Sequence, residues 1–428
     1  MKSLSRRTWI QSSAAISCGF WLGSTAKAAA PSPNDKLNLA FIGVGGRGAA
    51  NLGGLSNQNL VAFCDVDGTR AKAAFEKYPS VAKYTDYRRM LDQLDSKIDG
   101  VVISTPDHTH FHPASQAIEM GKHVYLEKPM AHNLWETRTL TDMARQKGVA
   151  TQLGVQRHTL PNVHRTVELI QSGAIGDVSE VYCWINGSRG MPGEPKDQPP
   201  IPADLNYPLW TGPAASRPYH PSVTPYGWRF WWDYGTGETG NWGCHILDIP
   251  FWALDLKYPT RVSASGPPVD PKMTPKSMET KFLFPAKGKR KPVTLHWDHL
   301  ANGPKILKQQ NLPNKGYNTL FVGDKGMLLT GFSKLKLYPE ADYSEFTAPN
   351  QTVQRSPGFY KEWVTACQGG QAATCHFDYS GPLAETVMLG NLAYRSQENF
   401  DWDSENLLTS SPKANVLIKT KYASGWQT

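Results

Sequence analysis

A glycine-rich loop between an apolar run and a helix-forming segment constrains the fold of this chain more than any other feature. Residues 37–42 form the apolar run, which is typical of a buried strand, and residues 49–55 can begin a helix. The loop between them contains Gly43, Gly45, Gly46, Arg47 and Gly48. Glycines at this spacing permit a tight turn, close approach to a pyrophosphate and close helix–strand packing. We therefore expect these five residues to bind a dinucleotide, with its phosphates at the N-terminus of the helix.

An acidic residue ends the next predicted strand. Residues 60–64 are apolar and Asp65 follows them, about twenty residues after the glycine loop. A carboxylate at this place binds the two ribose hydroxyls of NAD and repels the extra phosphate of NADP. NAD is thus the expected cofactor and NADP the less favoured one. Arg70 is open to two interpretations, because it can pair with a phosphate or lie on a solvated helix face.

Strand-like and helix-like segments continue to alternate up to about residue 154. The further strands are expected at 100–104 and 123–126, and the helices at 71–78, 86–94 and 113–120. This alternation predicts a parallel, doubly wound α/β sheet. Ligands bind beyond the carboxyl ends of such strands, so residues 105–110 and 127–129 are the first places to look for chemistry.

Those two segments carry motifs that resemble a known family. Thr105, Pro106 and His110 form TPxxxH, and residues 121–129 read GKHVYLEKP. Together with the glycine loop, they are similar in order and spacing to the Gfo/Idh/MocA oxidoreductases, such as glucose-fructose oxidoreductase and inositol dehydrogenase. The resemblance is strongest over 37–130 and implies an N-terminal Rossmann NAD-binding domain. It also implies a C-terminal α+β domain with an open, mostly antiparallel sheet.

The resemblance implies roles for individual residues of these motifs. Lys128 is expected beside the nicotinamide and the substrate hydroxyl, where a cation stabilises alkoxide character, although a lysine in a loop can also be a plain surface residue. Thr105, Pro106, His110 and Glu127 are expected around the cofactor. His108 and His112 alternate with His110, yet no Cys or carboxylate set completes a site, so we expect no metal.

The alternation of strand-like and helix-like segments ends after residue 154. We predict a Rossmann domain over 36–154 and a substrate-binding and oligomerisation domain over 155–428, of which 385–428 is a closing segment. Gln156 and Arg157 follow the boundary and are substrate-binding candidates. Residues 186–227 contain ten prolines, too many for regular structure, so this long loop is expected to form a wall or lid over a site.

Six tryptophans gather between positions 210 and 252. Flat apolar faces beside N–H donors suit a carbohydrate ring, and Trp228, Trp231 and Trp242 are therefore candidates for substrate contact. Aromatic clusters belong to the hydrophobic core as often as they form a binding surface.

Residues 241–245, Asn-Trp-Gly-Cys-His, stand where the family carries DxGxH. His245 then matches the general base that takes the hydroxyl proton, although it can also be a buried structural histidine. Asn241 replaces the family's aspartate and can orient a hydroxyl, but it cannot accept a proton. Asp248, one turn further, can orient a neighbour or act on the helix dipole.

The first thirty residues resemble an export signal peptide. Arg6 and Arg7 precede an uncharged, fairly apolar run and small residues, as in a twin-arginine signal, although an ordinary secretory signal with a chance arginine pair is the alternative. We expect a periplasmic or otherwise exported protein without a membrane span after residue 30. The net charge of +8 includes four basic residues and no acid in this segment, so the remaining small excess does not predict nucleic-acid binding.

Three functions are compatible with these residues. The first is an NAD-dependent oxidoreductase with tightly held cofactor, acting on a secondary hydroxyl of a sugar, sugar derivative or glycoside. The second is an NAD-dependent glycosidase that oxidises the ring transiently, eliminates the leaving group and adds water. The third is a non-catalytic sugar-binding protein that retains NAD. The resemblance also implies a homo-oligomer, a dimer or tetramer.

Overall fold

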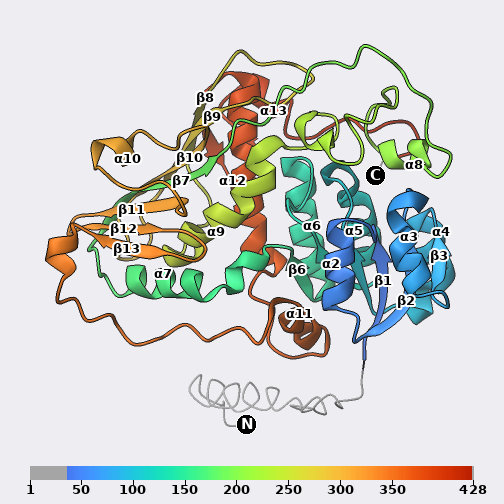
Figure 1. The fold of residues 1–428 in the computed structure, drawn as a ribbon, viewed down its shortest axis with the longest axis horizontal. Helices are drawn as coiled ribbons and strands as arrows, with labels where there is room; N and C mark the ends of the chain where they lie inside the picture. Colours follow the sequence, from blue (N-terminus) through green and yellow to red (C-terminus); the bar gives the residue numbers. More distant parts are fainter. Residues whose placement is uncertain (1–35, 427–428) are drawn as a thin grey trace, which may run out of the picture. The chain divides into compact units, whose positions relative to one another are not determined.

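The computed structural model describes residues 36–426, and its first sheet has six parallel strands (Figure 1). Their order is β3-β2-β1-β4-β5-β6. The strands are β1 (Asn38–Ile42), β2 (Asn59–Cys64), β3 (Ala82–Tyr84), β4 (Gly100–Ile103), β5 (His123–Leu126) and β6 (Thr151–Leu153). This confirms the expected doubly wound sheet. The predicted export segment, 1–30, lies outside the described residues.

Helices connect these strands in the expected alternation. They are α2 (Arg47–Gly54), α3 (Gly68–Lys77), α4 (Tyr87–Leu94), α5 (Phe111–Glu119) and α6 (Leu134–Lys147), with short turns η1 (Asp95–Lys97) and η2 (Asp107–Thr109). All four residues of β4 are buried, as expected for a central strand covered on both faces. Because the strands are parallel, Asp65, Ser104 and Glu127 emerge at one edge, directly after β2, β4 and β5.

The second sheet has nine strands in the order β13-β12-β11-β7-β10-β9-β8-β14-β15. The strands are β7 (Val178–Asn186), β8 (Arg261–Ser265), β9 (Met278–Phe284), β10 (Val293–Leu300), β11 (Thr319–Gly323), β12 (Met327–Thr330), β13 (Leu335–Tyr338), β14 (Phe400–Asp403) and β15 (Leu408–Thr409). Only β7 and β10 pair in parallel within this sheet. The mostly antiparallel sheet is thereby confirmed. Strand β9 alternates strictly between buried and exposed residues, so one face of this strand is covered and the other open.

The longest helix, α12, packs against β8, α9 and α6 and so lies between the two sheets (Figure 1). The helices and turns of this part are η3 (Gln156–Thr159), α7 (Pro161–Gln171), α8 (Tyr207–Thr211), η4 (Gly227–Phe230), η5 (Thr239–Gly243), α9 (Cys244–Ala253), α10 (Ile306–Gln309), η6 (Glu340–Tyr343), α11 (Phe359–Cys367), α12 (Phe377–Ser396) and α13 (Pro412–Asn415). Within the closing segment, the sequence predicts a helix only over 385–396, because glycine and proline, here Gly381 and Pro382, are unfavourable inside a helix. Gly381 is needed there, since a Cβ on it would lie 2.4 Å from Thr141 Oγ1 of α6.

The chain returns to the first sheet late in the sequence. Trp363 of α11 is fully buried and meets the ring of Tyr125 on β5 at 5.8 Å. Gln152 of β6 donates a hydrogen bond to Phe359 O at 2.8 Å. Residues 37–428 form one compact unit, so the domain boundary near residue 154 stays a prediction.

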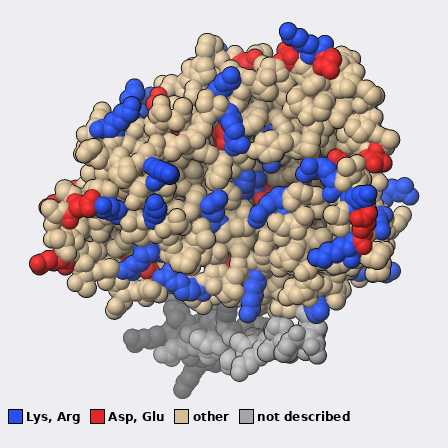
Figure 2. Space-filling view, viewed as in Figure 1, with Lys and Arg blue, Asp and Glu red and all other residues tan. Residues whose placement is uncertain are grey.

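Within residues 36–426, no helix combines the length and the apolar character that crossing a bilayer requires. Figure 2 shows Lys and Arg side chains spread singly over one face of the molecule rather than gathered into a stripe. A stripe of basic residues is the usual mark of a nucleic-acid surface.

Candidate active site

A cleft of about 730 Å³ runs along the carboxyl edge of the first sheet and is roofed by the proline-rich loop. Most residues predicted for the site line it: Gly43, Gly45, Arg47, Asp65, Thr105, Pro106, Glu127, Lys128, Gln156, Arg157, Trp228, Asn241, Trp242 and His245. Segments up to two hundred residues apart in the sequence thus meet in one place.

The glycine loop leaves room for a phosphate group. Gly43 has φ of 80°, and a Cβ on Gly48 would lie 2.0 Å from the carbonyl oxygen of Gly43. Gly46 has φ of 53°, and its Cβ would meet Arg70 Nη2 at 2.5 Å. Side chains are therefore excluded at these positions, which fits the pyrophosphate of a dinucleotide. Arg70 is exposed and also lines the cleft, so its pairing with a phosphate stays a prediction.

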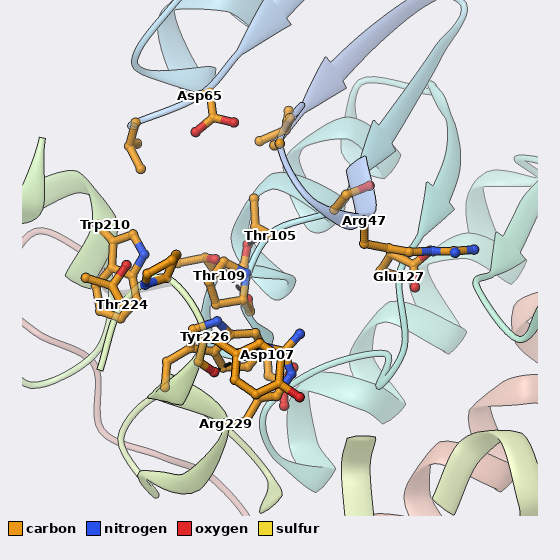
Figure 3. Close-up of a pocket in the computed structure, with 18 of the residues that line it drawn as sticks. Arg47, Asp65, Thr105, Asp107, Thr109, Glu127, Trp210, Thr224, Tyr226 and Arg229 are labelled. Carbon is orange, nitrogen blue, oxygen red and sulfur yellow. Dashed lines mark hydrogen bonds and ion pairs between the residues drawn. The ribbon is translucent and has the colours of Figure 1, made fainter. Parts of the chain in front are cut away.

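Asp65 lies at one end of the cleft, where the ribose of a dinucleotide is expected (Figure 3). Its carboxylate accepts hydrogen bonds from the backbone N–H of Val44 at 2.9 Å and of Asp67 at 3.0 Å. Burial raises the pKa of Asp65, while these amides act in the opposite direction. The acid thus holds the end of β2 against the start of the glycine loop.

Glu127 joins three segments through one oxygen atom. Its Oε1 accepts hydrogen bonds from Gln156 Nε2 at 2.7 Å, Asn51 Nδ2 at 2.9 Å and Arg47 Nε at 3.2 Å. The side chain is 7% exposed, and Arg47 is 46% exposed. Figure 3 shows Arg47 and Glu127 beside each other in the cleft. Glu127 therefore fixes helix α2 and the turn η3 around the end of β5.

Lys128 is bound to the turn that carries Asn241. Its Nζ donates a hydrogen bond to the backbone oxygen of Asn241 at 2.8 Å and lies 3.5 Å from Asn241 Oδ1. Asn241 lies in η5, a π-helical turn, and such turns occur frequently at functional sites. Burial lowers the pKa of Lys128, against the opposing charges of Glu127 and Asp107. The ammonium is thus held at the end of β5, facing the cleft.

His245 lies in the first turn of α9 and lines the same part of the cleft. Burial lowers the pKa of His245 well below its ordinary value, and the charges of Lys128, Arg157 and Arg47 lower it further. Its buried Nδ1 has no hydrogen-bond partner among the described residues. At neutral pH this imidazole is therefore uncharged and able to accept a proton.

The turn η3 is tied to α9 by a buried His–Asp pair. His158 Nδ1 lies 2.9 Å from a carboxylate oxygen of Asp248, and Tyr379 OH donates to Asp248 at 2.7 Å. Cys375 lies near enough to complete a group that could hold a metal ion, but burial raises the pKa of its thiol well above the usual range. Asp248 thus orients the segment that carries Gln156 rather than the substrate.

Four predicted residues do not line the cleft. Gly46 and Gly48 shape the loop from behind. His110 is buried, with Nδ1 2.7 Å from Pro129 O and Nε2 2.8 Å from Thr105 O, so it connects the two motif loops. Trp231 is 2% exposed and belongs to an aromatic core cluster.

Several cleft residues were missed by the sequence reasoning. Asp107, Tyr226 and Arg229 lie together at the end of the cleft away from Asp65, and Trp210 lines its side (Figure 3). For Trp210 and Tyr226 the proline content was the available signal, because it marked a functional loop without saying which of its side chains turn inward. Asp107 lies in the segment 105–110 that the sequence singled out, and Arg229 directly follows the loop.

The same loop is fastened to the first sheet. Gly68 N–H donates to Asp204 O at 2.8 Å, and Asn206 N–H donates to Val66 O at 2.8 Å, directly beyond Asp65. The segment near the C-terminus adds a further contact, because Ala423 N–H donates to Pro213 O at 2.9 Å. These bonds hold the wall of the cleft at its dinucleotide end.

Comparison with known proteins agrees with this geometry. Residues 37–155 match the model of the oxidoreductase family Gfo/Idh/MocA, NAD-binding Rossmann fold, and residues 182–281 match its C-terminal alpha/beta domain. An uncharacterized oxidoreductase of Rhizobium meliloti is 34% identical over 28% of this chain and 36% of its own length. Inositol 2-dehydrogenase of Salmonella typhimurium is 30% identical over 34% of this chain and 45% of its own length. The chain thus spans less than half of the length of these curated relatives.

Solved structures share the fold over most of the chain. The WlbA dehydrogenase of Bordetella pertussis, solved with NADH and UDP-GlcNAcA, has a TM-score of 0.62 at 16% identity and covers 86% of this chain and 99% of its own. Levoglucosan dehydrogenase in complex with NADH has a TM-score of 0.58 at 18% identity, over 86% of this chain and 99% of its own. At such identities the likeness concerns the fold. With both family domains matched in order, the chain belongs to the Gfo/Idh/MocA oxidoreductase family and carries its NAD-binding Rossmann domain.

Proposed function

We propose that this protein is an NAD-dependent oxidoreductase that oxidises a secondary hydroxyl of a sugar, sugar derivative or glycoside. The observation that carries the proposal is the placement of Lys128 and His245 in the cleft that also holds the glycine loop. Oxidation of an alcohol removes a hydride and a proton. This reaction requires a cation and a neutral imidazole beside the dinucleotide site.

Each residue has a defined part in this reaction. NAD, when bound, accepts the hydride from the carbon that carries the hydroxyl. Lys128 donates a hydrogen bond to the substrate oxygen and stabilises its negative charge, and the Asn241 carbonyl holds the ammonium in place. His245 takes the hydroxyl proton, since its depressed pKa keeps it uncharged at neutral pH. Trp242 presents aromatic surface to the sugar ring, whereas Trp228 lines the cleft as a buried ring on which Arg229 stacks.

The cofactor is held tightly in this proposal. The hydrogen bonds that Asp204 and Asn206 make with Gly68 and Val66 hold the loop beside Asp65, and this supports slow release of NAD. A cofactor that stays bound must be reoxidised by a second substrate or within the same catalytic cycle. The second possibility is the glycosidase route, in which oxidation and reduction occur in the same turnover.

Export and self-association also belong to the proposal. The paired Arg6 and Arg7 support delivery to the periplasm after folding, which suits a protein that loads its cofactor first. The exposed residues of β9, which leave one face of that strand uncovered, support a homo-oligomer. Light scattering on the purified protein tests the oligomer, and fractionation of cells that express the full chain tests the location.

The decisive experiment is mass spectrometry of products after incubation of the NAD-loaded protein with free sugars and glycosides. A product lighter by two hydrogens supports the dehydrogenase. Net addition of water supports the glycosidase instead, and absence of any product while sugars still bind supports the non-catalytic function. The variant Lys128→Met, loaded with NAD to the same level, is the control for chemistry by contaminants.

A further inference from the structure

At the end of the cleft where the reaction is proposed, beside Lys128, the positive side chains outnumber the described carboxylates. Lys128, Arg157 and Arg229 line it, and no carboxylate of residues 36–426 forms an ion pair with any of them. The described carboxylate near them that is free of an ion pair is Asp107, whose Oδ2 accepts hydrogen bonds from Thr236 Oγ1 at 2.6 Å and Thr236 N at 3.2 Å. Three cations thus face one carboxylate.

Two other arginines of the cleft do not add to this excess. Arg47 is paired with Glu127 at 3.2 Å, and Arg189 is paired with Glu238 at 2.6 Å. Both pairs are neutral as a whole.

Arg229 and Arg157 both stack on aromatic rings of the cleft, and Arg229 is the one of the two that lies beside Asp107. Its guanidinium lies 4.3 Å from the ring centre of Tyr226 and 4.3 Å from that of Trp228. One of its N–H groups donates to Tyr226 O at 3.1 Å, and no other side-chain hydrogen bond of Arg229 is found within the described residues. Stacking on aromatic rings fixes the plane of a guanidinium while its edge keeps free donors, and such a fork matches an oxyanion.

The position of Arg229 separates it from the cofactor phosphates. Figure 3 shows it with Asp107 and Tyr226 on the side of the cleft away from Asp65. Its charge acts on Lys128, lowering the pKa of that ammonium. A neutral sugar bound here would shield the excess positive charge from water and would offer it no negative partner. Burying an unpaired charge in this way is unfavourable.

We propose that the substrate is a sugar that carries an oxyanion, a carboxylate or a phosphate, and that Arg229 binds this group. The inference rests on the proposed function, since it assumes that a sugar occupies the end of the cleft beside Lys128. Arg229 is then a residue that determines specificity, and Lys128 and His245 perform the chemistry.

Binding to the NADH-loaded full-length protein tests the inference without turnover. Isothermal titration compares glucose with glucuronate and glucose 6-phosphate, and galactose with galacturonate. We expect at least one anionic sugar to bind roughly ten- to a hundredfold more tightly than its neutral parent, as for charge-assisted hydrogen bonds in a partly buried site. The uronate and phosphate arms distinguish the two oxyanions.

Variants connect the preference to the residue. Arg229→Gln should abolish the preference and leave the affinity for neutral sugars nearly unchanged, whereas Arg229→Lys should keep part of it. Arg70→Gln removes an equal charge at the dinucleotide end and should leave the preference intact. Thermal unfolding and NADH fluorescence verify that each variant is folded and loaded.

The outcomes separate this inference from the proposed function. Equal or absent binding of all anionic sugars overturns the inference, as does a preference that survives in Arg229→Gln. If a neutral sugar is oxidised and no anionic one is preferred, the dehydrogenase stands and the inference fails. If the preference depends on Arg229 but no sugar is oxidised, the inference stands and the dehydrogenase fails.

Discussion

Replacing Glu127 by glutamine should loosen the cleft, because one oxygen of this side chain holds three donors. Two of them are the side-chain amides of Asn51 and Gln156, at 2.9 and 2.7 Å. A hydrogen bond to a charged group contributes about 1 kcal/mol more than one between neutral groups, so their weakening costs about 2 kcal/mol. The ion pair with Arg47 adds little, since Arg47 is 46% exposed and screened by solvent. We expect a total loss of about 2 kcal/mol in the free energy of unfolding.

Urea unfolding of the wild type and Glu127→Gln, followed by tryptophan fluorescence, measures this loss, and NADH titration measures the effect on the cofactor. The matched control is Glu76→Gln, which removes an exposed carboxylate paired with Lys72 at 3.9 Å. That change should cost no more than about 0.5 kcal/mol. If both variants lose the same small amount, the oxygen of Glu127 does not hold the segments together and the reasoning is refuted.

Three further predictions concern the chemistry. Lys128→Met should lower kcat by about a hundredfold or more while NADH still binds, and a rate within a few-fold of wild type would argue against its role. The pKa of His245 is lowered, so its neutral form persists as the pH falls below 6.5, the ordinary histidine value. The fall of kcat/KM on the acid side of the pH profile should therefore have its midpoint well below pH 6.5. A midpoint at or above that pH would contradict the role of His245 as the base. Asn241→Asp places a carboxylate beside Nζ of Lys128, now 3.5 Å from the amide oxygen, and should raise the oxidation rate if acid–base capacity limits it; stopped-flow measurement of NADH formation decides.

Much of the site was accessible from local sequence. The glycine loop, Asp65 and the residues after β4 and β5 are short motifs attached to strands, and parallel strands bring their carboxyl ends to one edge whatever the remaining details. The helix with Gly381 and Pro382 was shortened in the prediction, because its stability comes from packing against α6 and β8 rather than from propensity.

The sequence by itself therefore determined the family, the dinucleotide loop and the pair Lys128 and His245. Only the tertiary structure decided which residues of the long loop face the cleft, since proline-rich backbone has no period from which a direction can be read. Directly after the loop, Arg229 turns toward the cleft and Trp231 into the core although they are two positions apart. Arg229 stacks there on Tyr226 and Trp228, whereas Trp231 packs in a cluster with residues distant in sequence, such as Met273.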